Sequence, residues 1–218
     1  MKTSVMCVTQ LLLAACLWAG TASAMPDGPG CENGKPAMHR HACGGVEIGA
    51  PAPPFTLEGV ANLEFKNVSL SDFRGKWVVL FFYPGDFTLV CHSEIKGLGG
   101  AVAEFTQANA QVLAVSADSK FSHLAWIKSG ALDTPQFPLL SDFNKRTARA
   151  YGVLDENSGR ARRGLFIIDP NGVVQYQVVH SDKIGRSVEE TLRVLRALQT
   201  EELCPLNWKP GEKPLGKP

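Results

Sequence analysis

Hydrophobic and polar positions along the chain predict a set of buried strands separated by helices. The run Trp77–Tyr83 has no polar alternation and is rich in β-branched and aromatic residues, which is typical of a central strand buried on both faces. Pro84 and Gly85 end this strand. The segments 111–117 and 164–168 have the same character and predict two further buried strands.

Helical spacing follows the first strand. Four apolar residues there share one face of a helix, namely Ile95, Leu98, Val102 and Phe105. Glycines at 97, 99 and 100 weaken this prediction, because each costs about 1 kcal/mol relative to alanine in a helix interior. A short helix is predicted over 123–128, between the second and third strands.

The C-terminal third of the chain contains a turn, a strand and a helix. The residues from Asp169 to Gly172 are of the types that favour a turn. The strand predicted over 173–179 should therefore pair antiparallel with the strand predicted over 164–168. Ser187 and Glu190 form a capping box that starts the last helix. We expect an α/β protein with a mixed central sheet flanked by helices, on the plan of a thioredoxin-like fold.

Both ends of the chain differ in character from this domain. Residues 1–24 resemble an export signal, with Lys2, an apolar run over 11–20 and small residues before Met25. An alternative is a lipoprotein signal, in which lipid is attached to Cys16. Residues 25–49 predict an extended arm outside the core, 50–200 the folded domain, and 201–218 a loosely ordered tail that carries Cys204.

Charge and cysteine content narrow the functions and the compartment. The formal net charge is +1, so no global field attracts nucleic acid or an anionic membrane. Cleavage after Ala24 would leave four of the six cysteines, and the sequence alone does not choose among their pairings. An export signal places the protein in the periplasm or outside the cell, where disulfides are stable.

The arm contains two cysteines and two histidines with the pattern CxxxxxxxHxHxC, formed by Cys31, His39, His41 and Cys43. Four such ligands could hold zinc or copper, although the spacing matches no standard zinc finger. The other reading is a disulfide between Cys31 and Cys43 that closes a small loop. Both interpretations stay open at this point.

Cys91 is the candidate nucleophile. It follows the first strand at the expected start of a helix, where unpaired backbone amides favour the reactive thiolate. Pro84 and Thr88 lie seven and three residues before it, in the loop that joins strand to helix. There proline can shield the sulfur, and the threonine hydroxyl can hydrogen-bond the sulfur or a bound oxygen.

The stretch from Phe81 to Ile95 resembles the PxxxTxxC active-site motif of peroxiredoxins. It is similar to their typical two-cysteine branch, the alkyl hydroperoxide reductase and thiol-specific antioxidant family. Four other segments carry the same resemblance: APPF at 52–55, HLAW at 123–126, RGLFIID at 163–169 and LCPLNW at 203–208. Together they cover roughly residues 46–212.

This resemblance implies a thiol-dependent peroxidase without a cofactor or a metal at its site. Cys91 would be the peroxidatic cysteine, Cys204 the resolving cysteine, and Arg163 the guanidinium that favours the thiolate and orients the peroxide. Pro84 and Thr88 would line the site, and Glu94 would orient an arginine. The implied partners are hydrogen peroxide or alkyl hydroperoxides, a thioredoxin-like or other dithiol reductant, and further copies of the chain in a homodimer or a decamer.

One feature departs from the family pattern. The proline and threonine that usually follow the nucleophile in the family are His92 and Ser93 here.

The sequence also argues against another function of the same fold. A disulfide oxidoreductase normally has a CxxC pair, and Cys91 is not part of one. The alternative function is a holdase-like oligomer or a metal-binding protein built on this scaffold.

Overall fold

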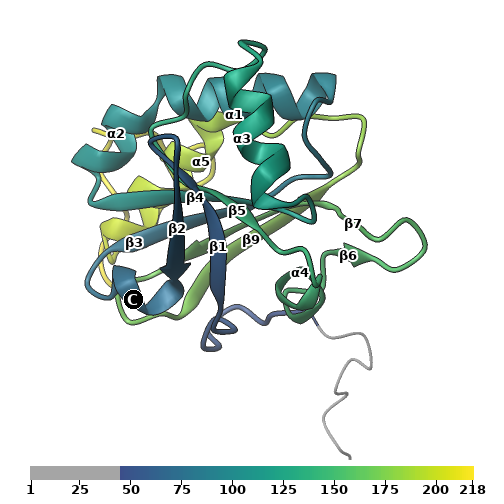
Figure 1. Ribbon diagram of the computed structural model, residues 1–218. Coiled ribbons are helices and arrows are strands. Elements are labelled where there is room, and N and C mark those ends of the chain that lie inside the picture. The colour runs from purple at the N-terminus through teal and green to yellow at the C-terminus, as the bar shows by residue number, and fades with distance from the viewer. Residues whose placement is uncertain (1–44) are drawn as a thin grey trace, which may run out of the picture. The chain divides into compact units, whose positions relative to one another are not determined.

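The computed structural model describes residues 45–218, in which a seven-stranded sheet forms the centre (Figure 1). The strands run in the order β2-β1-β5-β4-β3-β8-β9. Their bounds are Thr56–Ala61 (β1), Glu64–Ser69 (β2), Trp77–Phe82 (β3), Ala110–Ser116 (β4), Leu139–Ser141 (β5), Arg163–Ile168 (β8) and Val174–His180 (β9). A separate hairpin consists of β6 (Leu154–Asp155) and β7 (Arg160–Ala161).

The sheet is mixed, as the sequence predicted. β4 pairs parallel with β3 and with β5, whereas β3 pairs antiparallel with β8, and β8 with β9. The predicted turn between β8 and β9 is confirmed: the Gly172 amide donates to the Asp169 carbonyl at 2.8 Å, and the Asp169 carboxylate accepts from the amides of Asn171 and Val173. The antiparallel pairing of β3 with β8 places the start of β8 at the same end of the sheet as the end of β3.

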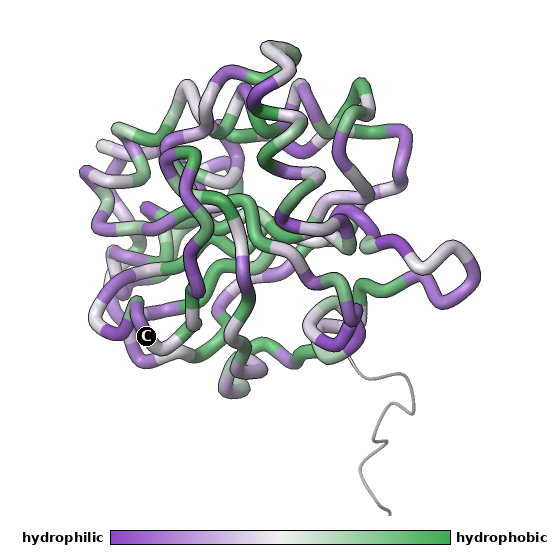
Figure 2. Tube along the Cα trace, in the orientation of Figure 1, coloured by the Kyte–Doolittle hydropathy of each residue, from purple (hydrophilic) through white to green (hydrophobic). Residues whose placement is uncertain are grey.

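β3 is buried on both faces, which confirms the interpretation of its uninterrupted apolar run. Val79 and Phe81 belong to one core, and Leu80 and Phe82 belong to the core on the opposite face. Figure 2 shows the hydrophobic residues concentrated along these central strands. The strand that leads to Cys91 is therefore fixed from both sides.

Four helices pack over the face that contains Phe81, and they lie together on one side of the sheet in Figure 1. They are α1 (Leu89–Gly100), α2 (Val102–Gln107), α3 (Lys120–Lys128) and α5 (Val188–Gln199). The other face is covered by α4 (Arg146–Ala150) and by the segment that enters β1. A 3-10 turn, η1 (Leu70–Phe73), precedes β3.

Two helix predictions need correction in detail. The helical face from Ile95 to Phe105 does not belong to one helix, because the chain breaks at Ala101, directly after Gly99 and Gly100. The side chain of Ser187 does accept from the Glu190 amide at 3.0 Å, but the Glu190 carboxylate pairs with Arg193 instead of completing the capping box.

Both ends of the described chain make contacts that the sequence did not predict. Residues 1–44, with the predicted export signal and the Cys/His pattern, lie outside the described residues. The end of the predicted arm packs on the domain: Val46 is buried and the Gly49 amide donates to the Val174 carbonyl. In the tail, Leu203 exchanges backbone hydrogen bonds with Leu215 and Gly216. From Val46 onward the predicted arm therefore packs on the domain, and the tail is paired with itself, whereas the prediction for residues 25–44 stays untested.

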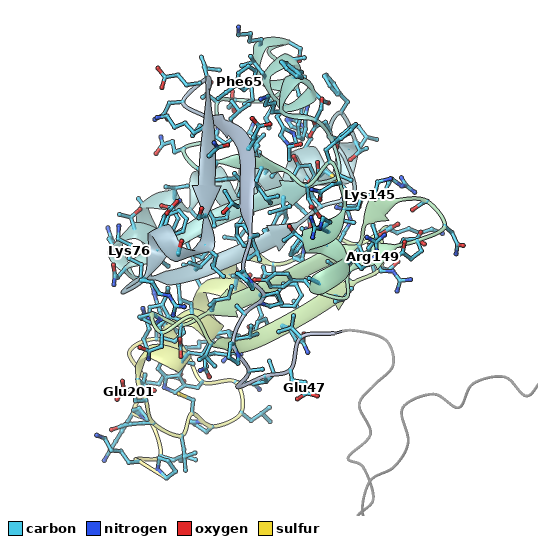
Figure 3. All side chains as sticks on the ribbon, turned by 60° about the horizontal axis from the view of Figure 1, so that its bottom comes forward. Glu47, Phe65, Lys76, Lys145, Arg149 and Glu201 are labelled. Atoms are coloured by element: carbon cyan, nitrogen blue, oxygen red, sulfur yellow. The ribbon has the colours of Figure 1, made fainter. Side chains whose placement is uncertain are left out.

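The sequence patterns missed several short elements. The β1–β2 hairpin, β5, α4 and the β6–β7 hairpin were not predicted. Arg149 of α4 forms a bidentate ion pair with Glu156 in the β6–β7 hairpin, and Figure 3 shows Arg149 beside this hairpin. From Gly45 onward, none of the helices has the length and apolar character needed to cross a bilayer.

Candidate active site

Cys91 is the third residue of α1, at the point where the chain turns from β3 into this helix. Its side chain is 0% exposed and lies within the core on the Phe81 face. The N-cap residue is Thr88, whose backbone is extended. The thiol therefore sits in the first turn of a 12-residue helix, where the unpaired amides favour negative charge on sulfur.

Arg163 brings a positive charge to this sulfur. It is the first residue of β8, and its Nη1 donates to Cys91 Sγ at 3.4 Å and to Glu94 Oε2 at 2.5 Å. Its Nε donates to the carbonyl of Asp182 at 2.9 Å. Burial alone would lower the pKa of the guanidinium, but Cys91 and Glu94 together raise it above its ordinary value. The arginine thus stays charged beside the thiol.

Glu94 lies one helical turn after Cys91 and holds two arginines. Its Oε1 accepts from the Arg186 backbone amide at 2.8 Å and from Arg186 Nε at 2.9 Å, while Oε2 accepts from Arg186 Nη2 at 3.0 Å. Burial would raise the pKa of this carboxyl, but the hydrogen bonds and charge of Arg186, with the charge of Arg163, leave it below its ordinary value. Glu94 is therefore an ionised anchor for Arg163.

Arg186 is a residue that the sequence reasoning missed. Its Nη1 donates to the carbonyls of Phe82 and Gly164 at 2.8 and 2.6 Å, and its guanidinium lies 3.5 Å from the centre of the Phe81 ring. Burial lowers the pKa of Arg186, an effect that Glu94 opposes. One sequence signal existed: a cation directly before the N-cap of a helix opposes the helix dipole and so indicates a compensating partner.

The other predicted site residues occupy the loop before Cys91 and its first helical turn. Pro84 is buried two residues after the end of β3. The Thr88 hydroxyl is exposed and donates to the Gly85 carbonyl at 3.0 Å, so it can accept a hydrogen bond from a peroxide but must rotate to donate one. His92, which replaces the family proline, is half-buried, and its backbone amide donates to the Thr88 carbonyl.

Cys204 lies away from this cluster, in the segment after α5. It is half-buried, and its Sγ is 3.6 Å from the Thr200 hydroxyl, beside a groove that Arg193 and Leu206 help to line. Within residues 45–218, both Cys91 and Cys204 are free thiols. The structure thus joins Cys91, Glu94 and Arg163 in one site and leaves Cys204 outside it.

This arrangement can activate a thiol and stabilise a leaving oxygen. The helix terminus and Arg163 both favour the thiolate, and the same guanidinium is placed to meet negative charge that develops beside the sulfur.

In the described part of the chain, no group of three His, Cys, Asp or Glu side chains is placed to hold a metal ion. Cys31, His39, His41 and Cys43 lie outside that part.

Comparisons with known proteins identify the family of the chain. Residues 48–177 match the AhpC/TSA family. The chain is 50% identical over 185 residues to the mitochondrial thioredoxin-dependent peroxide reductase of Homo sapiens. The aligned residues cover 81% of this chain and 72% of that protein. It is also 50% identical over 175 residues to the chloroplastic 2-Cys peroxiredoxin BAS1 of Hordeum vulgare, with 76% of this chain and 83% of that protein covered.

Solved structures give the same answer for the fold. The reduced 2-Cys peroxiredoxin of Plasmodium vivax superposes with a TM-score of 0.74 at 40% identity, over 77% of this chain and 91% of that chain. The thioredoxin-like fold expected from the sequence is thereby confirmed. The chain belongs to the AhpC/TSA family and is a typical 2-Cys peroxiredoxin.

Proposed function

We propose that this peroxiredoxin reduces hydrogen peroxide and organic hydroperoxides with the Cys91 thiolate and regenerates it through a disulfide with Cys204. The observation that carries the proposal is the contact between Arg163 Nη1 and Cys91 Sγ, because it places a permanent positive charge beside the candidate nucleophile. The name of the human relative, a thioredoxin-dependent peroxide reductase, supports both the peroxide substrate and a dithiol reductant.

The first step is a nucleophilic substitution at oxygen. The Cys91 thiolate attacks the terminal peroxide oxygen, an S–O bond forms, and the O–O bond breaks. The leaving oxygen departs with the electron pair and takes up a proton, so water or an alcohol is released and Cys91 becomes a sulfenic acid. Arg163 stabilises the charge on the leaving oxygen, and Thr88 is the second group in reach of the peroxide.

The second step forms a disulfide. The Cys204 thiol attacks the Cys91 sulfenic acid, water leaves, and the two sulfurs are joined. Because Cys91 is fully buried and Cys204 lies outside its site, the segment around Cys91 must unwind for the sulfurs to meet. The partner cysteine comes from a second copy in a homodimer, and a decamer would be built from such dimers. A thioredoxin-like or other dithiol then supplies two electrons and restores both thiols.

No observation in the described residues favours the alternative of a holdase-like or metal-binding protein. The Cys91 thiol contacts Arg163, and Glu94 holds this arginine in place. Each of these three groups has a role in the proposed peroxidase cycle. The proposal is therefore the peroxidase.

The test uses reduced protein mixed with an equimolar amount of hydrogen peroxide. We expect the peroxide to be consumed and a disulfide that joins the Cys91 and Cys204 peptides to appear on non-reducing gels and in peptide mass spectra. In Cys204→Ser, the oxidation should stop at a sulfenic acid on Cys91. Consumption of peroxide without any change at Cys91 would rule the proposal out.

The proposed place of action is outside the cytoplasm, in the periplasm or as a secreted protein. The support is the sequence of residues 1–24, with its basic start, apolar run and small residues before Met25. We expect the intact mass of the protein from an extracytoplasmic fraction to correspond to a chain that starts at Met25. A lipid-modified chain that starts at Cys16 would support the lipoprotein alternative, and a cytoplasmic chain that keeps residues 1–24 would contradict export.

A further inference from the structure

Basic residues gather around the β6–β7 hairpin, which leads into Arg163, and the mechanism above does not use them. Between positions 145 and 162 the chain has five cationic residues and two acidic ones, Asp155 and Glu156. Five cations less two acids give this segment a net charge of +3, whereas the whole chain has +1. The five cations are Lys145, Arg146, Arg149, Arg160 and Arg162.

Most of this positive charge is not neutralised by a neighbour. Arg149 forms an ion pair with Glu156 at 2.7 Å. The Asp155 carboxylate accepts from the Ser158 hydroxyl at 2.7 Å. Among the residues that the structure describes, the other four cations have no ion-pair partner, and we call them the basic cluster: Lys145, Arg146, Arg160 and Arg162.

The basic cluster forms one surface although its members come from two elements. Arg160 and Arg162 are exposed on either side of the buried Ala161. The Lys145 side chain, at the N-cap of α4, lies against Gly159 in the hairpin turn. Figure 3 shows Lys145 beside this hairpin. The hairpin and the start of α4 therefore present their cations together.

This surface lies at the active-site end of the sheet (Figure 1). Only Arg162 separates β7 from Arg163, whose guanidinium contacts Cys91, and Arg163 lies at the end of the sheet where β3 leads into the active-site loop. In the loop that follows β9 at this end, Asp182 and Lys183 are both exposed and balance each other. A solute that approaches Cys91 past the hairpin therefore meets a net positive field.

Such a field acts on charged substrates and not on neutral ones. Cations of one sign beside a site raise the local concentration of an anion and its rate of encounter, most strongly at low ionic strength. Guanidinium groups also pair with carboxylates through two parallel hydrogen bonds. Hydrogen peroxide is uncharged at neutral pH, so its reaction gains nothing from the basic cluster.

We propose that the basic cluster makes this enzyme selective for organic hydroperoxides that carry a carboxylate. The inference rests on the proposed function, because it names the preferred substrate of the Cys91 thiolate. The chemical step is unchanged: an S–O bond forms, the O–O bond breaks, and the alcohol that leaves after taking up a proton keeps its carboxylate. The cluster accelerates the encounter that precedes this step.

The test compares two substrates that differ only in charge, a short-chain hydroperoxy acid and its methyl ester. Each is mixed with the reduced protein at pH 7 in a stopped-flow instrument, with hydrogen peroxide as the third substrate. In wild type at low salt, we expect the acid to oxidise Cys91 about tenfold faster than the ester, at the lower end of the range for electrostatic steering. The ratio should fall towards one at about 1 M salt, where the Debye length is about 3 Å.

The decisive variant is Arg160→Gln/Arg162→Gln, which removes two exposed charges of the basic cluster. It should react about threefold to tenfold more slowly with the acid, and at the wild-type rate with the ester and with hydrogen peroxide. The matched control, Lys66→Gln/Lys76→Gln, removes the same charge from two exposed positions, one on the opposite edge strand β2 and one before the start of β3. It should leave all three rates unchanged.

Three results would overturn the inference. If Arg160→Gln/Arg162→Gln slowed the acid and the ester equally, the two arginines would only support the fold of the hairpin. If the acid reacted at the wild-type rate, or if the control variant slowed it as much, the basic cluster would not select the substrate. Failure of the proposed function is a separate result, because Cys91 of the wild type would then react with none of the three peroxides.

Discussion

Methionine in place of Arg163 is expected to slow the reaction of reduced Cys91 with hydrogen peroxide by about 10²- to 10³-fold, the usual cost of losing one preorganised donor to a developing oxyanion. The substitution removes the guanidinium whose Nη1 lies 3.4 Å from Cys91 Sγ. It should leave the fold largely intact, because both oxygens of Glu94 remain hydrogen-bonded to Arg186. The second-order rate constant in stopped-flow mixing is the measurement.

The neighbouring residue provides a matched control. Arg162 precedes Arg163 in the chain but is exposed, so Arg162→Met removes the same charge without touching the site. Arg163→Lys keeps the charge but cannot reach Cys91 Sγ and Glu94 with one planar group, and should be intermediate. Equal rates in Arg163→Met and Arg162→Met would show that the guanidinium has no role in the attack.

Glutamine in place of Glu94 is expected to lower the free energy of unfolding by about 3–5 kcal/mol, because it leaves buried charges without their counter-ion. The side chains of Arg163 and Arg186 are 4% and 3% exposed, and both depend on this carboxylate. Denaturant unfolding at pH 7 and fixed protein concentration measures the change. Glu104→Gln, which breaks only an exposed pair with Arg196 at 3.5 Å, should cost less than about 1 kcal/mol.

The stability contributed by Glu94 should depend on pH in one direction. Its pKa in the folded protein is lowered from the ordinary value of 4.5: burial raises it, and the contacts with Arg186 and Arg163 lower it by more. The contribution is therefore complete above the unfolded pKa and is lost as the pH falls through the folded pKa. The difference between wild type and Glu94→Gln should shrink below pH 4.5 and stay constant above it. A difference that grows with acid would contradict this assignment.

The central strands were predictable because their signal is local. The apolar run at Trp77–Tyr83 and the turn at Asp169–Gly172 each contain their own structural preference, and both were predicted within a residue or two. β5 has only three residues and takes its register from β1 and β4, so nothing in its own sequence distinguishes it from a loop. The tail was misjudged because proline and lysine content says nothing about long-range backbone pairing.

The site residues also differ in how far the sequence alone could predict them. Cys91, Thr88 and Pro84 lie in one contiguous motif, and Arg163 was placed by a second motif at the start of β8. Arg186 contacts Glu94 across 92 residues of sequence, through a pairing that only the folded chain creates. His123 began a predicted helix, and its burial against Asp86 could not be predicted, because it depends on how α3 meets the active-site loop.

The folded-back tail has a mechanical consequence. Leu203, the residue before Cys204, donates to the Gly216 carbonyl and accepts from the Leu215 amide, both at 2.8 Å. A displacement of the Cys204 backbone towards a partner sulfur would strain this backbone pairing of Leu203. Two hydrogen bonds of about 1 kcal/mol each stabilise the pairing. In the proposed disulfide step, the activation barrier would then include two separate rearrangements, the unwinding of the start of α1 and the opening of the backbone pairing between Leu203 and residues 215–216.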